Sequence, residues 1–205
     1  KYGLIHTDRG DTLVFHLGMS GRWRIDPTEL DKHDHLLIET DEGRRLALND
    51  PRRFGSVDLV RTEELESWDG IAPLGPEPFD LTAEELARRL AGRGAAIKQL
   101  LLDQRIVAGL GNIYVCEALH RAGINPNRAG GRVSKARLEK LVPAIKAVLA
   151  EAIEAGGSTL RDYAQPDGAL GYFSKNFAVY DREGGDCLCG GKVKRIVQGG
   201  RSTWY

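Results

Sequence analysis

Alternation of apolar and polar residues over the first 60 positions is typical of strands that bury one face. Residues 7–11 form a polar, glycine-containing segment between two such runs, which suits the turn of a β-hairpin. The predicted strands cover residues 2–6, 12–16, 35–40, 45–48 and 57–60. We therefore expect an antiparallel sandwich or barrel in this part of the chain.

The pattern changes to a helical period at Thr82. Thr82 and Glu85 have the spacing of a capping box, and Leu86 and Leu90 follow on one face of the predicted helix. Further helices are predicted over residues 95–103 and 112–122, with Gly123 in the left-handed position at the end. The longest helix should begin near Ser134 and carry Leu138, Leu141, Val142, Ile145, Val148, Leu149 and Ile153.

These elements predict the α+β class, with strands first, helices next and a small β segment last. Residues 71–81 are rich in proline and glycine and are expected to link the parts. The expected division is a β-sandwich domain over residues 1–70, a helical domain over 82–175 and a terminal β segment over 176–205.

Composition narrows the class of protein. The 205 residues are 41% hydrophobic and 28% charged, which excludes a disordered or fibrous chain. No apolar run reaches the ~18 residues that a membrane span needs. Three cysteines are too few for a disulfide scaffold, so we expect a reducing, cytoplasmic setting.

The distribution of charge is more informative than the net charge of zero. Residues 1–80 hold 10 Lys and Arg against 17 Asp and Glu, whereas residues 81–205 hold 19 against 12. The second part could therefore face phosphates. Ordinary solvated charge is an equally good explanation of this asymmetry.

A turn with two glycines, Gly109 and Gly111, joins two predicted helices. Glycines let a backbone approach a ligand closely, and the free N–H groups at a helix start attract phosphate. Asn112 is placed to cap the second helix and to add an amide donor, and Lys98 can add a positive charge. A purely structural corner between helices is equally consistent with this pattern.

Two close cysteines, Cys187 and Cys189, precede a basic segment that is prone to form a hairpin. This pattern suggests half of a zinc ribbon, but a closed zinc site takes four ligands. Cys116 falls within a predicted helix and is expected to be a small core residue.

Two loops of the first part, residues 16–21 and 49–55, carry candidate wedges for a base stack. Met19 lies near glycines, and Arg52 and Phe54 are two residues apart on a turn. A buried methionine and an arginine paired with an aspartate are the structural alternatives. Two histidines, His33 and His35, could share a strand face, although a polar loop is the more ordinary context than a metal site.

Taken together, the motifs resemble the bacterial formamidopyrimidine-DNA glycosylases, the Fpg/MutM branch of the Fpg/Nei base-excision-repair enzymes. The resemblance extends over the whole chain. It rests on HLGMSG, KHDH, NDPRRFG, LGPEP, IKQLLLDQ, GLGNIYVCEAL, GGSTLRDY, DGALGYF and GRSTWY. It implies a partial N-terminal β-sandwich, a helix–two-turn–helix domain and an incomplete zinc-ribbon hairpin.

The resemblance also implies roles for individual residues. Met19, Arg52 and Phe54 would fill the space left by a flipped oxidised purine. The remaining DNA contacts implied by the family are His33, Arg93, Lys98, Asn112 and Arg201. The stretch with Asp167, Gly168 and Tyr172 is similar to the family's lesion-capping loop, and Cys187 and Cys189 to two of its four ligands for one structural zinc.

Family chemistry begins with an N-terminal proline amine that attacks C1′ and forms a Schiff base, assisted by a glutamate. Neither residue is in this sequence, and we expect the chain to be a portion of a longer protein. Lys1 would then correspond to the lysine of β-elimination and Arg201 to the residue of δ-elimination.

The expected function is that of a bacterial, monomeric glycosylase and abasic-site lyase that acts on double-stranded DNA with oxidised purines. One alternative is a DNA-binding fragment or paralogue without catalysis. The other is a Nei-type enzyme for oxidised pyrimidines, against which the capping-loop stretch argues.

Overall fold

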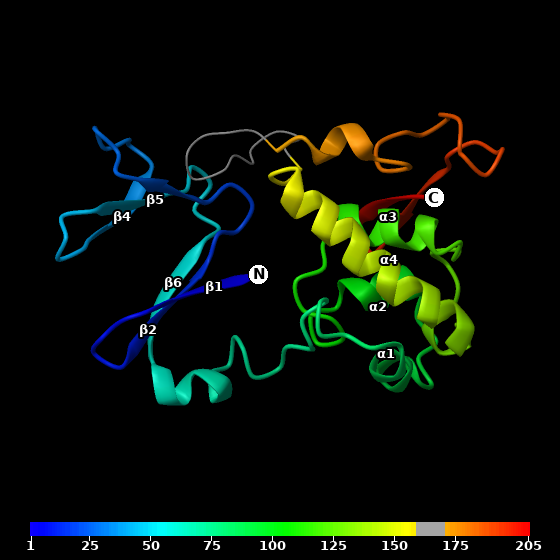
Figure 1. The fold of residues 1–205 in the computed structure, drawn as a ribbon, viewed down its shortest axis with the longest axis horizontal. Helices are drawn as coiled ribbons and strands as arrows, with labels where there is room; N and C mark the ends of the chain where they lie inside the picture. The colour runs from blue at the N-terminus through cyan, green and yellow to red at the C-terminus, as the bar shows by residue number, and fades with distance from the viewer. Residues whose placement is uncertain (159–170) are drawn as a thin grey trace. The chain divides into compact units, whose positions relative to one another are not determined.

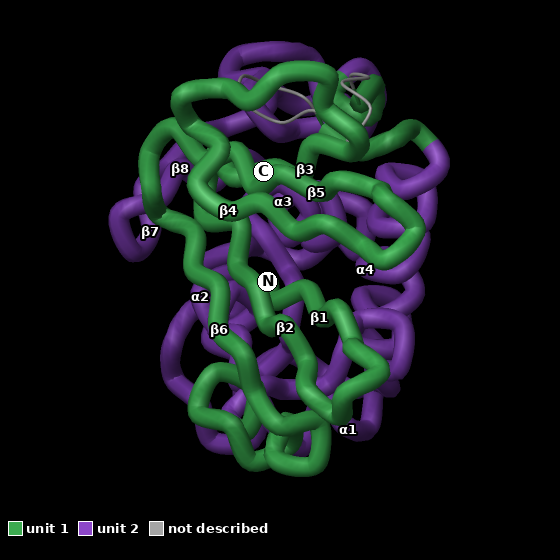
Figure 2. Tube along the Cα trace, turned by 90° about the vertical axis from the view of Figure 1, so that its left-hand side faces the viewer, with its two compact units in different colours: residues 1–72, 155–174 green, residues 73–154, 175–205 purple. Residues whose placement is uncertain are grey.

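The computed structural model describes residues 1–158 and 171–205. The chain divides into two compact units, coloured separately in Figure 2. Unit 1 comprises residues 1–72 and 155–174, and unit 2 comprises residues 73–154 and 175–205. Each unit is described by itself below.

Unit 1 contains two antiparallel three-stranded sheets, and Figure 2 labels their strands. In the first sheet β2 lies between β1 and β6, and in the second β5 lies between β3 and β4. The bounds are β1 Tyr2–His6, β2 Asp11–His16, β3 Arg22–Ile25, β4 Asp34–Glu39, β5 Arg45–Asn49 and β6 Ser56–Arg61. A 3₁₀ helix, η1, follows at Thr62–Ser67.

The predicted alternation is confirmed in β1, β2 and β4, but not in β5, where Ala47, Leu48 and Asn49 are all buried. Val14 and Thr12 of β2 are fully buried, whereas their neighbours along the strand are partly exposed. Strand β3 was not predicted, because its four residues Arg-Trp-Arg-Ile give too short a pattern to recognise. Pairing with β5 defines this strand, with Trp23 opposite Leu48.

Unit 2 is built on four α-helices, α1 Ala83–Leu90, α2 Ile97–Leu102, α3 Asn112–Arg121 and α4 Lys135–Glu154 (Figure 1). A short 3₁₀ helix, η2, lies at Gly130–Arg132. Helix α4 packs against both α1 and α3. Its face formed by Leu138, Leu141, Ile145 and Val148 is buried, as the spacing predicts. Ile153 is an exception, with 69% of its surface exposed, because it lies in the last turn beyond the packed face.

Half of the predicted capping box is present at the start of α1. The Thr82 hydroxyl accepts a hydrogen bond from the backbone N–H of Glu85 at 3.1 Å. The Glu85 carboxylate does not bond back to the N-cap backbone but accepts from Arg88 and Arg89. Two arginines one turn further on compete successfully for this carboxylate.

The end of unit 2 has less strand than its sequence suggests. Among residues 176–205 the structure assigns only β7, Arg195–Gln198, and β8, Arg201–Trp204, which pair antiparallel. A 3₁₀ helix, η3, covers Phe173–Asn176. The glycines of the hairpin turn, Gly199 and Gly200, have φ values of 56° and 75°, a conformation that glycine adopts without strain.

A buried carboxylate anchors the chain that leads to this hairpin. Glu117 of α3 is fully buried and accepts hydrogen bonds from three successive backbone N–H groups, those of Ala178, Val179 and Tyr180. The distances from nitrogen to carboxylate oxygen are 2.9, 3.0 and 2.8 Å. The segment without regular structure is thereby attached to the helical core. Within the described part, none of the helices has the length and apolar character needed to cross a bilayer.

Candidate nucleic-acid interface

The wedge candidates of unit 1 are on the surface. Met19 is 68% exposed and Phe54 59% exposed, so neither belongs to the core. The guanidinium of Arg52 lies over the Phe54 ring, 4.9 Å from its centroid. The alternative of a buried methionine is therefore wrong, whereas the Arg52 backbone does hydrogen-bond to Asp50. Exposed apolar side chains on loops are of the type that inserts between bases.

The turn with His33 is held by carboxylates. The His33 backbone N–H donates to Asp31 Oδ1 at 2.8 Å, and the His33 ring centroid lies 6.4 Å from that of His35. His35 Nε2 lies 3.1 Å from the Asp50 carbonyl oxygen. His33 therefore lies in a polar turn, as expected, and is half-buried, whereas His35 lies in strand β4.

In unit 2, Gln104 holds the turn between α2 and α3. Its Nε2 donates to the carbonyls of Leu102 and Leu110, and its Oε1 accepts from the Gly109 N–H at 2.8 Å. Sequence reasoning did not single out this residue. The available signal was an amide side chain, which can both donate and accept, placed just before a two-glycine turn.

Asn112 does not cap α3, contrary to the expectation. The N-cap is Gly111, whose backbone is extended, and Asn112 is the first helical residue. Its Nδ2 donates to the Ser202 carbonyl at 2.9 Å, whereas its Oδ1 is buried without a partner in the described structure. Asn112 therefore joins the start of α3 to strand β8.

Arg201 is at the start of β8, opposite Gln198 in the hairpin. Gln198 Nε2 donates to Asn127 Oδ1 at 2.8 Å, which attaches the hairpin to the loop after α3. Arg201 itself is exposed. The hairpin thus presents a guanidinium next to the strand that Asn112 binds.

Lys98 of α2 has no exposed surface, and its Nζ has no hydrogen-bond partner among the described residues. Burial lowers the pKa of Lys98 below its ordinary value of 10.5, and the charge of Arg201 lowers this pKa further, whereas Cys116 acts in the opposite direction. Two cations are therefore near enough to repel each other, and neither has an ion-pair partner in the described part. An anion bound here would relieve the repulsion.

The burial of Lys98 leads to a stability prediction. Replacing Lys98 by methionine should raise the melting temperature at pH 7 by roughly 2–4 °C, because an unpaired buried polar group costs about 1 kcal/mol or more. Since the folded-state pKa is the lower one, the penalty is complete below that pKa and decreases as pH rises toward 10.5. Calorimetry at pH 7 and pH 10 should show a smaller gain at pH 10. A lower melting temperature for the variant would contradict this account.

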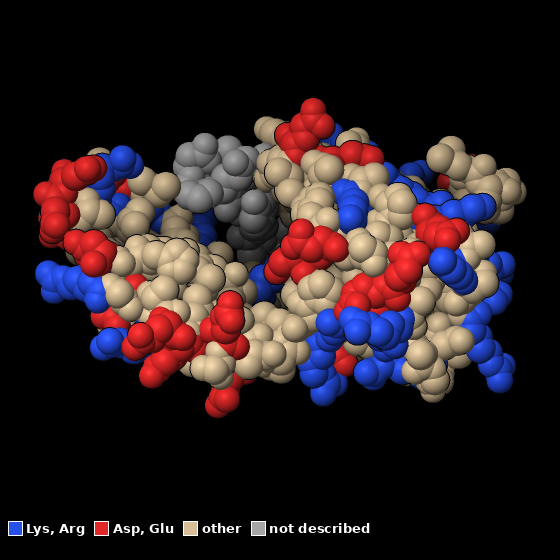
Figure 3. All heavy atoms as spheres, turned by 60° about the horizontal axis from the view of Figure 1, so that its bottom comes forward, with Lys and Arg blue, Asp and Glu red and all other residues tan. Residues whose placement is uncertain are grey.

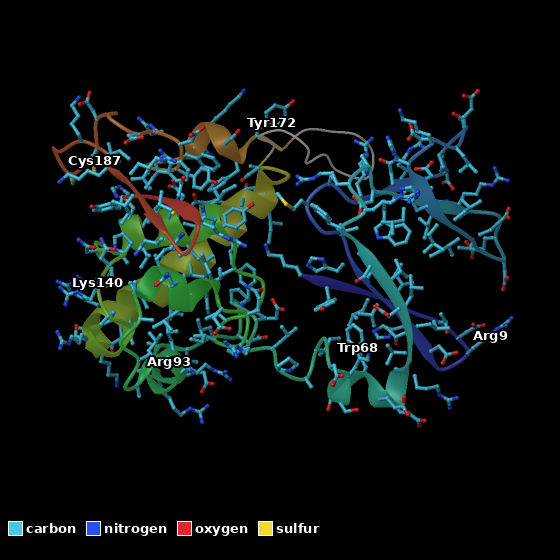
Figure 4. The ribbon with its side chains drawn as sticks, turned by 180° about the vertical axis from the view of Figure 1, so that it is seen from behind. Arg9, Trp68, Arg93, Lys140, Tyr172 and Cys187 are labelled. Carbon is cyan, nitrogen blue, oxygen red and sulfur yellow. The ribbon has the colours of Figure 1, made fainter. Side chains whose placement is uncertain are left out.

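The remaining candidate site residues have fewer contacts that bear on DNA binding. Arg93 follows α1, and its Nε donates to the Arg89 carbonyl, at the position labelled in Figure 4. Tyr172 is 58% exposed, and Lys1 is exposed at the first residue. Asp167 and Gly168 lie outside the described residues.

Several charges on the helices are paired. Figure 3 shows acidic and basic side chains next to each other on this face, in agreement with ion pairs that Glu85 forms with Arg89 and Glu84 with Lys135. Such surface pairs contribute little to stability. Lys98 differs from these surface charges because it has no exposed surface.

Cys187 and Cys189 are the candidate zinc ligands of unit 2. Cys187 Sγ accepts from the Cys189 N–H at 3.3 Å and lies 4.0 Å from His120 Nε2. In residues 1–158 and 171–205 no group of three or more His, Cys, Asp or Glu side chains could hold a metal ion. A closed zinc site takes four ligands, so the described residues do not form one by themselves. Cys116 is a buried core residue, as predicted.

Comparison with known proteins now decides the family. Residues 1–57 match the family model of the formamidopyrimidine-DNA glycosylase N-terminal domain, and residues 74–164 that of the formamidopyrimidine-DNA glycosylase H2TH domain. The formamidopyrimidine-DNA glycosylase of Novosphingobium aromaticivorans is 69% identical over 207 residues, which cover 100% of this chain and 77% of the relative. The chain belongs to the formamidopyrimidine-DNA glycosylase family.

Solved structures of the family have the same fold. MutM (Fpg) of Thermus thermophilus is 41% identical with a TM-score of 0.89, covering 100% of this chain and 77% of that one. A Lactococcus lactis Fpg variant in complex with Fapy-dG containing DNA is 31% identical with a TM-score of 0.90, with the same coverage. The α+β fold of this chain is therefore the glycosylase fold, and the chain is a base-excision-repair DNA glycosylase.

Proposed function

We propose that this glycosylase removes oxidised purines from duplex DNA and then cleaves the abasic site. The observation that carries the proposal is the anion site of unit 2, defined as Lys98, Asn112, Arg201 and the start of α3. Lys98 and Arg201, which have no acidic partner in the described part, interact electrostatically, and Arg201 precedes Ser202, whose carbonyl binds Asn112 at the start of α3. Cations and a helix start together favour a phosphate. A relative of the same fold is bound to Fapy-dG containing DNA.

Residue roles follow from chemistry and resemblance. Met19, Arg52 and Phe54 are proposed to fill the helix after base flipping, with the guanidinium of Arg52 contacting the orphaned base. His33 and Arg93 are proposed as further backbone contacts. Tyr172, with Asp167 and Gly168, is proposed to cover the flipped base.

For the elimination steps we propose Lys1 and Arg201. A primary or secondary amine can attack C1′, expel the base and form an iminium, after which loss of a proton at C2′ releases the 3′ phosphate. A proline and a glutamate are proposed for the first attack. This part of the proposal rests on the family resemblance alone. Zinc is proposed to hold the hairpin of Arg201 through Cys187 and Cys189 with two ligands outside these 205 residues, and the proposed setting is the bacterial cytoplasm.

The decisive test is covalent trapping. The intact protein, mixed with borohydride and a duplex that contains 8-oxoguanine, should give a stable protein–DNA adduct, because hydride reduces the iminium to an amine. An undamaged duplex of the same sequence serves as the control and should give none. Absence of the adduct despite tight binding would support a DNA-binding protein without catalysis. An adduct with thymine glycol but not with 8-oxoguanine would assign the Nei-type activity.

A further inference from the structure

Two buried polar residues lie at the end of strand β5 in unit 1, Asn49 as its last residue and Asp50 directly after it. Each is only 3% exposed, although both are hydrophilic. Buried polar side chains are retained where their hydrogen bonds are satisfied.

The Asp50 carboxylate joins two loops. Its Oδ1 accepts from the Ser20 hydroxyl at 2.8 Å, and its Oδ2 accepts from the Gly55 N–H at 2.8 Å. Ser20 follows Met19, and Gly55 follows Phe54. One carboxylate thus binds the loops of both apolar wedge candidates at once.

The same loops also touch through their backbones. Gly18 has a φ of 63°, and a Cβ placed there would lie 2.7 Å from the Phe54 carbonyl carbon. Any larger residue would push the two loops apart. The close approach therefore sets the distance between the two loops, and the hydrogen bonds of Asp50 hold Ser20 and Gly55 in fixed relative positions.

His33, another DNA-contact candidate of unit 1, is connected to Asn49 and Asp50 as well. The Asp50 N–H donates to the His33 carbonyl at 3.0 Å. Asn49 Nδ2 donates to Asp34 Oδ1 at 2.9 Å and to Asp31 Oδ1 at 3.3 Å. These carboxylates flank His33, so the turn of His33 is tied to the same two residues.

Asp50 is held in its charged form. Burial acts to raise the pKa of Asp50, but hydrogen bonds from Gly55, Ser20, Arg52 and Phe54 outweigh burial and hold this pKa below its ordinary value. A carboxylate that accepts on both oxygens is a stronger acceptor than a neutral group. The junction is therefore complete at neutral pH.

We propose that Asp50 is a positioning residue that makes Met19, Arg52 and Phe54 act as one rigid wedge, with Ser20 as the link to Met19. The inference rests on the proposed function, since it assumes that these side chains enter the base stack. A preorganised wedge does not have to be ordered during base flipping, which lowers the barrier. A loose Met19 loop would bind the duplex but insert slowly.

The test compares Ser20→Ala, Met19→Ala and the double variant of the intact protein in single-turnover excision of 8-oxoguanine. Ser20→Ala should slow excision about 10- to 100-fold, the range expected for one lost hydrogen bond to a charged group. In the Met19→Ala background it should cause no further slowing, because the link then positions nothing. Ser20→Thr retains the hydroxyl and should restore the rate.

A control variant and a second readout separate the explanations. Ser67→Ala removes another serine hydrogen bond of unit 1, to the Glu64 carbonyl, and should leave excision unchanged. A fluorescent base analogue beside the lesion should report reduced unstacking with Ser20→Ala at saturating protein. Equal slowing by Ser20→Ala with and without Met19, or none in either background, would overturn the positioning role. Unchanged excision by Met19→Ala itself would instead refute the proposed wedge.

Discussion

Replacing Asn112 by alanine is expected to weaken binding of lesion-containing duplex by about 10- to 100-fold. Two effects combine. The variant loses an amide donor near the proposed phosphate, and a hydrogen bond to a charged group contributes about 1.5–3 kcal/mol. It also loses the bond to the Ser202 carbonyl, which holds the strand of Arg201. Titration with a fluorescent duplex at fixed salt measures the change.

Salt dependence distinguishes Asn112 from Arg201. Asn112→Ala removes no charge, so the slope of log affinity against log salt should not change. Arg201→Ala should reduce the magnitude of that slope by about 1, because one fewer phosphate is neutralised. Asn125→Ala is the matched control, since the Asn125 side chain accepts the local N–H of Asn127 and bonds to no other described residue. Unaltered affinity for Asn112→Ala would exclude Asn112 from the interface.

Replacing Glu117 by glutamine is expected to destabilise the protein by about 2–4 kcal/mol, the largest effect on stability that we predict. The carboxylate satisfies three backbone N–H groups in a site without solvent. A glutamine of the same shape turns an N–H₂ toward donors, and buried donors without acceptors are costly. The midpoint of denaturant unfolding, measured with the slope held constant, reports the loss.

Glu151→Gln provides the comparison for Glu117. Glu151 forms an ion pair with Arg121 at 2.6 Å, but its side chain is 44% exposed. An exposed pair contributes about 0–1 kcal/mol. Equal destabilisation by the two variants would show that burial does not give Glu117 its importance.

Local patterns were sufficient to predict most elements. Strand Tyr2–His6 agrees with its prediction, and the Thr82 cap, the buried Leu86 and Leu90 and the left-handed Gly123 are all confirmed. These features depend on residues a few positions apart. Their physical causes, side-chain alternation and satisfaction of helix ends, act within one segment.

Only part of the candidate site could be predicted from local sequence patterns. Motifs indicated Met19, Arg52 and Phe54 as wedges, but only the structure shows Met19 and Phe54 exposed. The sequence placed Asn112 at the N-cap, yet its amide binds a carbonyl 90 residues away. Its partner could not be predicted, because no local rule specifies which distant strand packs on a helix start.

The sequence by itself determined the α+β class, the order of strands and helices, and the motifs of a DNA glycosylase. These features depend on the periodicity of apolar residues and on the spacing of residues that are close in the chain. Only the tertiary structure decided that Asp50 binds two loops, that Gln104 holds a turn, and that Lys98 is buried beside Arg201 without an acidic partner in the described part. The reason is physical. A polar side chain acquires its role from the groups that burial brings to it, and burial depends on the packing of distant segments.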